Sequence, residues 1–148
     1  MTTAEALHDL GVRRDTLTPE EKTSLDRDGY LALHNILDDE QVELLRTKFD
    51  EIAAREGAKA GAEVHQEEGT SRLSDLANKD PLFEVCFTHP RVLAAISHVL
   101  DGDLHLSSLN ARASLPGQGL QALHCDFDKA AQDNQYMVCN SIWLLTDF

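Results

Sequence analysis

The most informative segment of the chain is PGQGLQALHCDF, residues 116–127. Its first four residues predict a turn or loop, because proline and glycine favour turn conformations. The residues that follow, Leu120 to Phe127, predict a β-strand. Residues two apart on a strand point to the same face, so His124 and Asp126 would present an imidazole and a carboxylate side by side. Such a pair can bind one metal ion from one side.

The spacing of this pair is only weakly specific. The chain has 7 histidines and 26 acidic residues in 148 positions, so chance predicts about one His-x-Asp/Glu. Two occur, and the second, His65 to Glu67, lies in the glycine-rich stretch 57–71, which we expect to be a mobile loop with solvated acidic residues. With a further histidine, His124 and Asp126 would complete the two-histidine, one-carboxylate triad that holds Fe(II) in non-haem oxygenases.

Upstream of this segment the sequence predicts mainly helices. Residues 1–17 are polar and are expected to form an N-terminal arm. Thr18 is a capping residue and Pro19 suits the first position of a helix. The strongest pattern runs over residues 38–57, where apolar residues recur at helical spacing between two aspartates and a glycine. Another helix is predicted over residues 90–102, from a proline to a glycine.

Strands are predicted mainly in the second half of the chain. The expected ranges are Leu104 to Leu109, Leu120 to Phe127 and Tyr136 to Phe148, with one short strand earlier, Tyr30 to Leu33. Helices followed by strands indicate the α+β class. The last range is apolar and has no closing signal after it, so we expect the chain to be a fragment that lacks further strands.

The chain is strongly acidic, with 13 Lys and Arg against 26 Asp and Glu and a net charge of −13. Phosphate backbones and anionic lipid would be repelled, which argues against nucleic acids and membranes as partners. No stretch approaches the about 20 apolar residues of a transmembrane helix, and the N-terminus has no apolar signal core. Three cysteines, an odd and sparse set, favour a reducing compartment, so we expect a cytoplasmic protein.

Four segments of the chain resemble, in the same order, the phytanoyl-CoA dioxygenase family. Residues 116–127 resemble the family's metal-binding strand. DGYLALHNILDDEQVELLR (28–46) resembles its N-terminal strand and helix, and THPRVLAAISHVLDGDLHLSSLNAR (88–112) its helix leading into the first sheet strand. NSIWLLTDF (140–148) resembles the strand after the metal motif. The resemblance covers residues 18–148 as a partial domain.

The resemblance implies a fold, an activity and a set of cofactors. The fold would be N-terminal helices packed on part of a double-stranded β-helix, a jelly-roll or cupin-like architecture. The activity would be that of a dioxygenase that uses Fe(II), 2-oxoglutarate and O2 to hydroxylate a small-molecule metabolite. His124 and Asp126 would be iron ligands.

Further site residues follow from the resemblance and from their place on the predicted strands. Asn110 and Arg112 share a strand face, and we expect Asn110 to contact 2-oxoglutarate and Arg112 the substrate; the alternative is that both are solvated. Gln121 is assigned to 2-oxoglutarate on the resemblance alone. Asn140 lies in an apolar strand, where a buried amide needs partners. The cosubstrate is one candidate and a structural hydrogen bond is the other.

The chain departs from the family pattern at its end. The family's third iron ligand, a histidine, and its 2-oxoglutarate-binding arginine would lie beyond Phe148, so we expect the isolated chain to turn over little or no substrate. The substrate itself and the oligomeric state are not readable from the sequence. Two alternatives stay open: a non-catalytic relative that acts as a binding or dimerising module, and a bare metal-binding module in which a residue such as His105 joins the pair.

Overall fold

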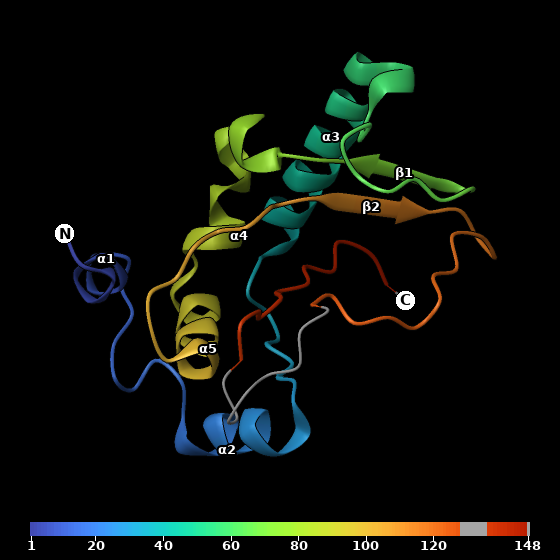
Figure 1. Ribbon diagram of the computed structural model, residues 1–148. Coiled ribbons are helices and arrows are strands. Elements are labelled where there is room, and N and C mark those ends of the chain that lie inside the picture. The colour runs from blue at the N-terminus through green and yellow to red at the C-terminus, as the bar shows by residue number, and fades with distance from the viewer. Residues whose placement is uncertain (128–135, 148) are drawn as a thin grey trace. The chain divides into compact units, whose positions relative to one another are not determined.

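The computed structural model describes residues 1–127 and 136–147. Within these ranges it contains α1 (Thr3–Asp9), α2 (Pro19–Asp28), α3 (Asp39–Glu56), α4 (Val85–Thr88) and α5 (Pro90–Leu100) (Figure 1). Two strands, β1 (Thr70–Leu73) and β2 (Ala111–Ser114), form an antiparallel sheet. Three short 3-10 helices complete the list: η1 (Gly57–Lys59), η2 (Leu76–Asn78) and η3 (Pro81–Glu84). These helices and strands confirm the α+β class.

The chain forms two compact units, each built from separate stretches of sequence. Unit 1 contains Met1–Ile36, Val85–His105 and the chain from Cys125 to Trp143, of which 125–127 and 136–143 are described. Unit 2 contains Leu37–Glu84, Leu106–His124 and the chain from Leu144 onward. The chain therefore passes from unit 2 into unit 1 between His124 and Cys125.

Unit 1 is built around α2 and α5, which are joined by two pairs of charged or polar side chains. Arg91 at the start of α5 pairs with Glu21 in the first turn of α2. Near the other end of α5, His98 Nε2 lies 2.8 Å from Asp26 Oδ1. The helices start where their capping residues predict, since Thr18 and Glu21 form a reciprocal capping box at α2.

The first 17 residues have more structure than a polar arm requires. They include α1, which begins with a capping box between Thr2 and Glu5. Leu17 is buried, with 2% of its surface exposed. No helix was predicted for these seven residues because they carry no apolar stripe, although Thr2 and Glu5 match the capping-box pattern. The domain boundary expected between residues 17 and 18 stays a prediction.

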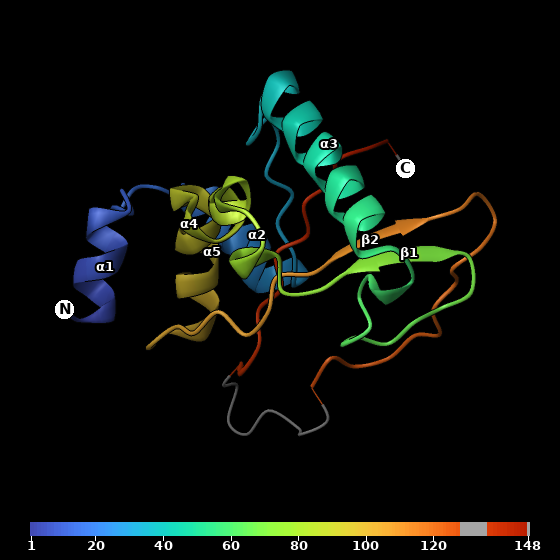
Figure 2. The same ribbon diagram turned by 90° about the horizontal axis from the view of Figure 1, so that it is seen from above.

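Unit 2 packs α3 against the two-stranded sheet, as the ribbon in Figure 2 shows. The helix predicted over residues 38–57 is confirmed, with Asp38 as its capping residue and Gly57 at its end. Leu45 and Ile52 lie on the buried face of α3, and Leu73 of β1 is fully buried. Burial of a leucine or isoleucine side chain contributes about 1.5–3 kcal/mol.

The stretch 57–71, expected to be a mobile loop, is partly ordered. It begins with η1 and ends in the first residues of β1. Gly61 has φ +63°, and a Cβ atom there would lie 2.6 Å from the backbone oxygen of Arg72. The glycine is therefore needed for the close approach of this loop to β1. Residues 60–69 form no helix or strand, as predicted for a loop, and the mobility of this stretch stays a prediction.

Four predicted strands are absent from the described residues. Leu104 to Leu109, Leu120 to Phe127 and Tyr30 to Leu33 are irregular, and so is 136–147 within the range predicted to reach Phe148. A strand exists only when a partner pairs with it, and apolar alternation specifies a face but not a partner. Among the described residues the only sheet is the two-stranded one, so they do not form a double-stranded β-helix.

The buried apolar core comes from the first two thirds of the chain. Its members are Leu17, Leu45, Ile52, Leu73, Leu76, Phe83, Cys86 and Val92. Large apolar side chains of the predicted strands are exposed instead, with exposures of 95% for Leu120 and 82% for Ile142. Across residues 1–127 and 136–147, no helix has the length and apolar character to cross a membrane.

Candidate metal centre

The two predicted metal ligands lie on an irregular part of the chain. His124 and Asp126 both have exposed side chains, and neither belongs to a strand. Strand geometry therefore does not turn His124 and Asp126 to one face. His124 is the last residue of its segment in unit 2, and Asp126 belongs to unit 1. Each is accordingly described by its own contacts.

His124 makes a local hydrogen bond through one ring nitrogen. Its Nδ1 lies 2.8 Å from the carbonyl oxygen of Ala122. A carbonyl only accepts, so this contact assigns the proton of the neutral ring to Nδ1 and the lone pair to Nε2. A histidine that binds metal through one nitrogen commonly donates its other ring N–H to a carbonyl or carboxylate. The contact of His124 Nδ1 with the carbonyl of Ala122 is of this kind.

Asp126 is held by an amide from a distant part of the chain. The Nδ2 of Asn140 donates to Oδ2 of Asp126 at 2.5 Å. Ligating carboxylates commonly accept such a second hydrogen bond. The prediction that Asn140 has a buried amide is wrong, since its side chain is exposed. The structure thus brings together two predicted site residues, Asp126 and Asn140, that are 14 positions apart.

Imidazole nitrogen and carboxylate oxygen are two of the three donors in a facial triad for Fe(II), so His124 and Asp126 fit such an ion as part of a site. Among the described residues, no group of three His, Cys, Asp or Glu side chains is placed to hold one metal ion. The bare metal-binding module, in which a residue such as His105 joins the pair, stays a prediction.

Arg112 and Gln121 converge on Glu67, in unit 2. Gln121 Nε2 donates to Glu67 Oε1 at 2.6 Å. Arg112 Nε lies 3.7 Å from Glu67 Oε2, and Arg72 Nη1 lies 3.4 Å from Glu67 Oε1. Arg112 also donates to the carbonyl oxygen of Gly119. Two residues that were predicted to bind cosubstrate and substrate are therefore engaged by the same carboxylate.

Glu67 is a negative charge held by positive neighbours. Its side chain is only 11% exposed. Burial raises the pKa of this carboxyl, but the charges of Arg72 and Arg112 and the hydrogen bonds from Gln121 and Thr70 outweigh burial and hold the pKa below its usual value. The acidic residues of this stretch were predicted to be solvated, and for Glu67 that prediction is wrong. The sequence carries no signal for this cluster, because Arg72 and Arg112 become neighbours only through the pairing of β1 with β2.

The side chain of Asn110 makes hydrogen bonds within unit 2. Its Oδ1 accepts a hydrogen bond from the backbone N–H of Asp75 at 3.3 Å, and its Nδ2 donates to Ser108 Oγ at 3.4 Å. Next to it, the backbone N–H of Leu76 donates to the carbonyl of Leu109 at 2.9 Å. Asn110 thus helps to join the chain before β2 to the chain after β1. Its predicted contact with 2-oxoglutarate stays a prediction.

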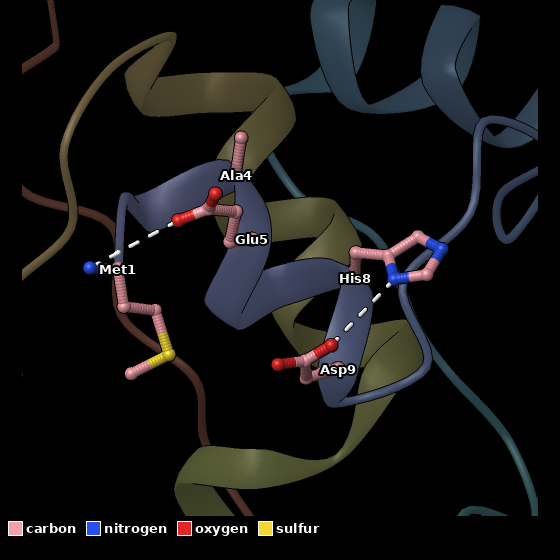
Figure 3. A pocket seen from close by; sticks show the side chains of 5 residues that line it. All are labelled: Met1, Ala4, Glu5, His8 and Asp9. Carbon is pink, nitrogen blue, oxygen red and sulfur yellow. Dashed lines mark ion pairs between the residues drawn. The ribbon is translucent and has the colours of Figure 1, made fainter.

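A surface hollow at the N-terminus does not involve the predicted site. Figure 3 shows its lining residues, Met1, Ala4, Glu5, His8 and Asp9, which all lie on or next to α1. The amino group of Met1 is 3.9 Å from Glu5 Oε2, and His8 Nδ1 is 3.7 Å from Asp9 Oδ1. These groups face solvent and pair with one another.

Comparison with known proteins identifies one family. The family model described as phytanoyl-CoA dioxygenase matches residues 25–148. This range covers most of the chain and includes both predicted ligands. No curated protein and no solved structure shows significant similarity to the chain.

Proposed function

Since the chain belongs to the phytanoyl-CoA dioxygenase family, we propose that it is part of an Fe(II)- and 2-oxoglutarate-dependent dioxygenase that hydroxylates a small-molecule metabolite. The observation that carries the proposal is the His124-Cys125-Asp126 motif within the range matched by the family model. In support, His124 contacts the carbonyl of Ala122 and Asp126 accepts a hydrogen bond from Asn140. Outer contacts of this kind are common for side chains that bind metals.

In this proposal His124 binds iron through Nε2 and Asp126 through its carboxylate. The third donor of the triad is supplied from outside the residues described here. Fe(II) with 2-oxoglutarate and O2 supplies the oxidising power for hydroxylation of an unactivated C–H bond, and the protein orients the reactants and excludes side reactions. The complete domain would be a double-stranded β-helix, and its location would be the cytoplasm.

We assign the other predicted residues to the organic reactants. Asn110 and Gln121 would contact 2-oxoglutarate, Arg112 the substrate, and Asn140 the cosubstrate in addition to Asp126. The charge balance bears on the substrate class, because coenzyme A esters carry phosphates that favour basic residues. The chain has a net charge of −13, and Lys129 is the only basic residue in 113–148. A metabolite without a phosphate-rich carrier is therefore the better fit.

The test is anaerobic addition of Fe(II) and 2-oxoglutarate, read by the visible charge-transfer band that this complex forms when the keto acid chelates iron. The wild-type chain is expected to show the band and His124→Ala to lose it, since the variant lacks one of the protein ligands. His34→Ala is the matched control, because it removes another exposed histidine from outside the proposed site.

A band in the wild-type chain and in His34→Ala, but not in His124→Ala, would support the proposal. A band that survives in His124→Ala would overturn the ligand assignment. If no variant shows a band, these residues do not assemble the complex by themselves, which is the outcome expected of an incomplete site or of a non-catalytic family relative.

A further inference from the structure

We propose that Glu67 is a positioning residue of the proposed metal centre, because it anchors to the β1–β2 sheet the segment that ends at His124. The inference rests on the proposed function as far as the metal is concerned. It concerns unit 2 only, to which Glu67, the sheet and His124 all belong. No contact between Glu67 and His124 is involved, and the effect is transmitted by the chain between them.

The first step is the charge arrangement of the sheet. Arg72 of β1 and Arg112 of β2 are directly opposite one another in the antiparallel register. Like charges in this position destabilise a strand pair. Glu67 lies 3.4 Å from Arg72 Nη1 and 3.7 Å from Arg112 Nε and is largely buried. The negative charge of its carboxylate therefore offsets the repulsion between the two arginines. The carboxylate is held beside the sheet, where it can accept further hydrogen bonds.

The second step is the attachment of the following segment to this acceptor. Gln121 Nε2 donates to Glu67 Oε1 at 2.6 Å, and Arg112, which Glu67 orients, donates to the carbonyl of Gly119. The start of the same segment is tied by the backbone, since the N–H of Leu115 donates to the carbonyl of Gly69 at 2.9 Å. Glu67 thus holds Gln121 directly and acts on the contact at Gly119 through Arg112.

The third step is the short distance along the chain from Gln121 to His124. Three residues span at most about 10 Å, so fixing Gln121 limits the positions that the imidazole can reach. The segment from Leu120 to His124 forms no strand, and Leu120 and Leu123 are exposed, so strand pairing and core packing do not restrain it. The hydrogen bond from Gln121 to Glu67 is therefore a restraint that ties this part of the chain to the sheet.

The experiment compares Glu67→Gln with two controls. Glu67→Gln keeps the shape of the side chain but removes the charge that two arginines require. Glu68→Gln makes the same change at the exposed neighbour. Leu73→Ala removes a fully buried side chain from β1 and weakens the same sheet without touching the Glu67 contacts. Each chain is measured well below its unfolding temperature.

Two readouts are used. The first is affinity for Mn(II) in the presence of 2-oxoglutarate, from the electron paramagnetic resonance signal of free Mn(II), an ion with oxygen and nitrogen preferences close to those of Fe(II). The second is the ¹H–¹⁵N heteronuclear NOE of the amides of residues 120–124, which falls when a segment becomes mobile on the picosecond to nanosecond timescale. The second readout needs no metal.

We expect Glu67→Gln to weaken Mn(II) binding by about 10-fold or more, as the loss of other outer contacts of metal sites does, and to lower the NOE of residues 120–124. Glu68→Gln should change neither. Leu73→Ala should lower the unfolding temperature while leaving affinity and NOE unchanged. Equal Mn(II) binding by wild type and Glu67→Gln would overturn the inference, and so would equal losses in Glu67→Gln and Leu73→Ala, which indicate a merely structural role.

The failure of the proposed function is distinguishable from the failure of this inference. If the wild-type chain does not bind Mn(II) with 2-oxoglutarate, the proposed function fails. The NOE then still decides the anchoring role. A fall confined to Glu67→Gln supports it, and unchanged values in that variant overturn it.

Discussion

At the scale of single residues, Asn140 contacts a proposed metal ligand from another part of the chain. Its Nδ2 donates to Asp126 Oδ2 at 2.5 Å across 14 positions of the chain. A carboxylate has about four lone-pair positions, so accepting one amide hydrogen bond is compatible with metal binding. The contact also restricts the rotation of the carboxylate, which reduces the entropy lost on binding.

Asn140→Ala should therefore weaken metal binding without abolishing it. We expect a loss of about 10- to 100-fold in Mn(II) affinity, the usual effect of removing an outer hydrogen bond of a metal ligand. The measurement is a Mn(II) titration in the presence of 2-oxoglutarate. Ser141→Ala is the matched control, because Ser141 is the exposed neighbour of Asn140. The same affinity in Asn140→Ala and Ser141→Ala would contradict the role of the amide.

At the scale of secondary-structure elements, α3 shows how strongly local chemistry defines a helix. Asp38 Oδ1 accepts a hydrogen bond from the backbone N–H of Gln41 at 2.8 Å, and Gln41 Oε1 accepts one from the N–H of Asp38 at 3.0 Å. These two contacts satisfy donors that a helix start leaves unpaired. At the other end the backbone N–H of Gly57 donates to the carbonyl of Ala53.

Asp38→Ala should destabilise the chain through the loss of this cap. The expected decrease in the free energy of unfolding is about 1 kcal/mol, as for other capping residues. Urea denaturation followed by circular dichroism measures it. Asp39→Ala removes the same charge one position later, where the side chain does not cap, and should cost clearly less. An equal loss in both variants would mean that only charge near the helix start matters.

At the scale of the whole molecule, the chain must fold despite a net charge of −13. Several acidic groups are stabilised in the folded state. A hydrogen bond from the backbone N–H of Thr18 lowers the pKa of Glu21, which burial opposes and Arg91 reinforces. The pKa of Asp80 is likewise lowered, by the backbone N–H of Leu82 and then by Lys48. The folded form therefore holds its carboxyl protons less tightly than the unfolded chain.

Stability should therefore fall in acid. A carboxyl group whose pKa is lowered on folding stabilises the fold fully above its unfolded pKa, about 4.3 for glutamate and 3.9 for aspartate. That contribution is lost as the pH falls through the folded pKa. We expect the thermal midpoint to fall slightly below about pH 6.5, because burial lowers the pKa of His89, and to decrease progressively below about pH 5 as the carboxyl groups take up protons. Glu21→Gln should show a shallower decrease, and Glu20→Gln, its exposed neighbour, should follow the wild type. A wild-type midpoint that does not fall below pH 5 would contradict the prediction.

The sequence by itself was sufficient for helices α2, α3 and α5 and for the family, but not for α1. The starts of α2, α3 and α5 follow from Thr18, Asp38 and Pro90, because capping and helical periodicity involve residues at most four positions apart. The resemblance to the phytanoyl-CoA dioxygenase family is confirmed over residues 25–148. Contacts between residues close in sequence, and motifs in a fixed order, can therefore be predicted from the sequence.

Only the tertiary structure decided which strands form and what the polar side chains contact. β1 arose in a stretch predicted to be a loop, and the apolar range from Leu120 to Phe127 is irregular, because a strand depends on a partner far away in sequence. Glu67 was expected to be solvated, yet it binds Arg112 and Gln121, which are 45 and 54 positions away. Such contacts form only when segments far apart in the sequence come together in the folded chain, so no local sequence pattern predicts them.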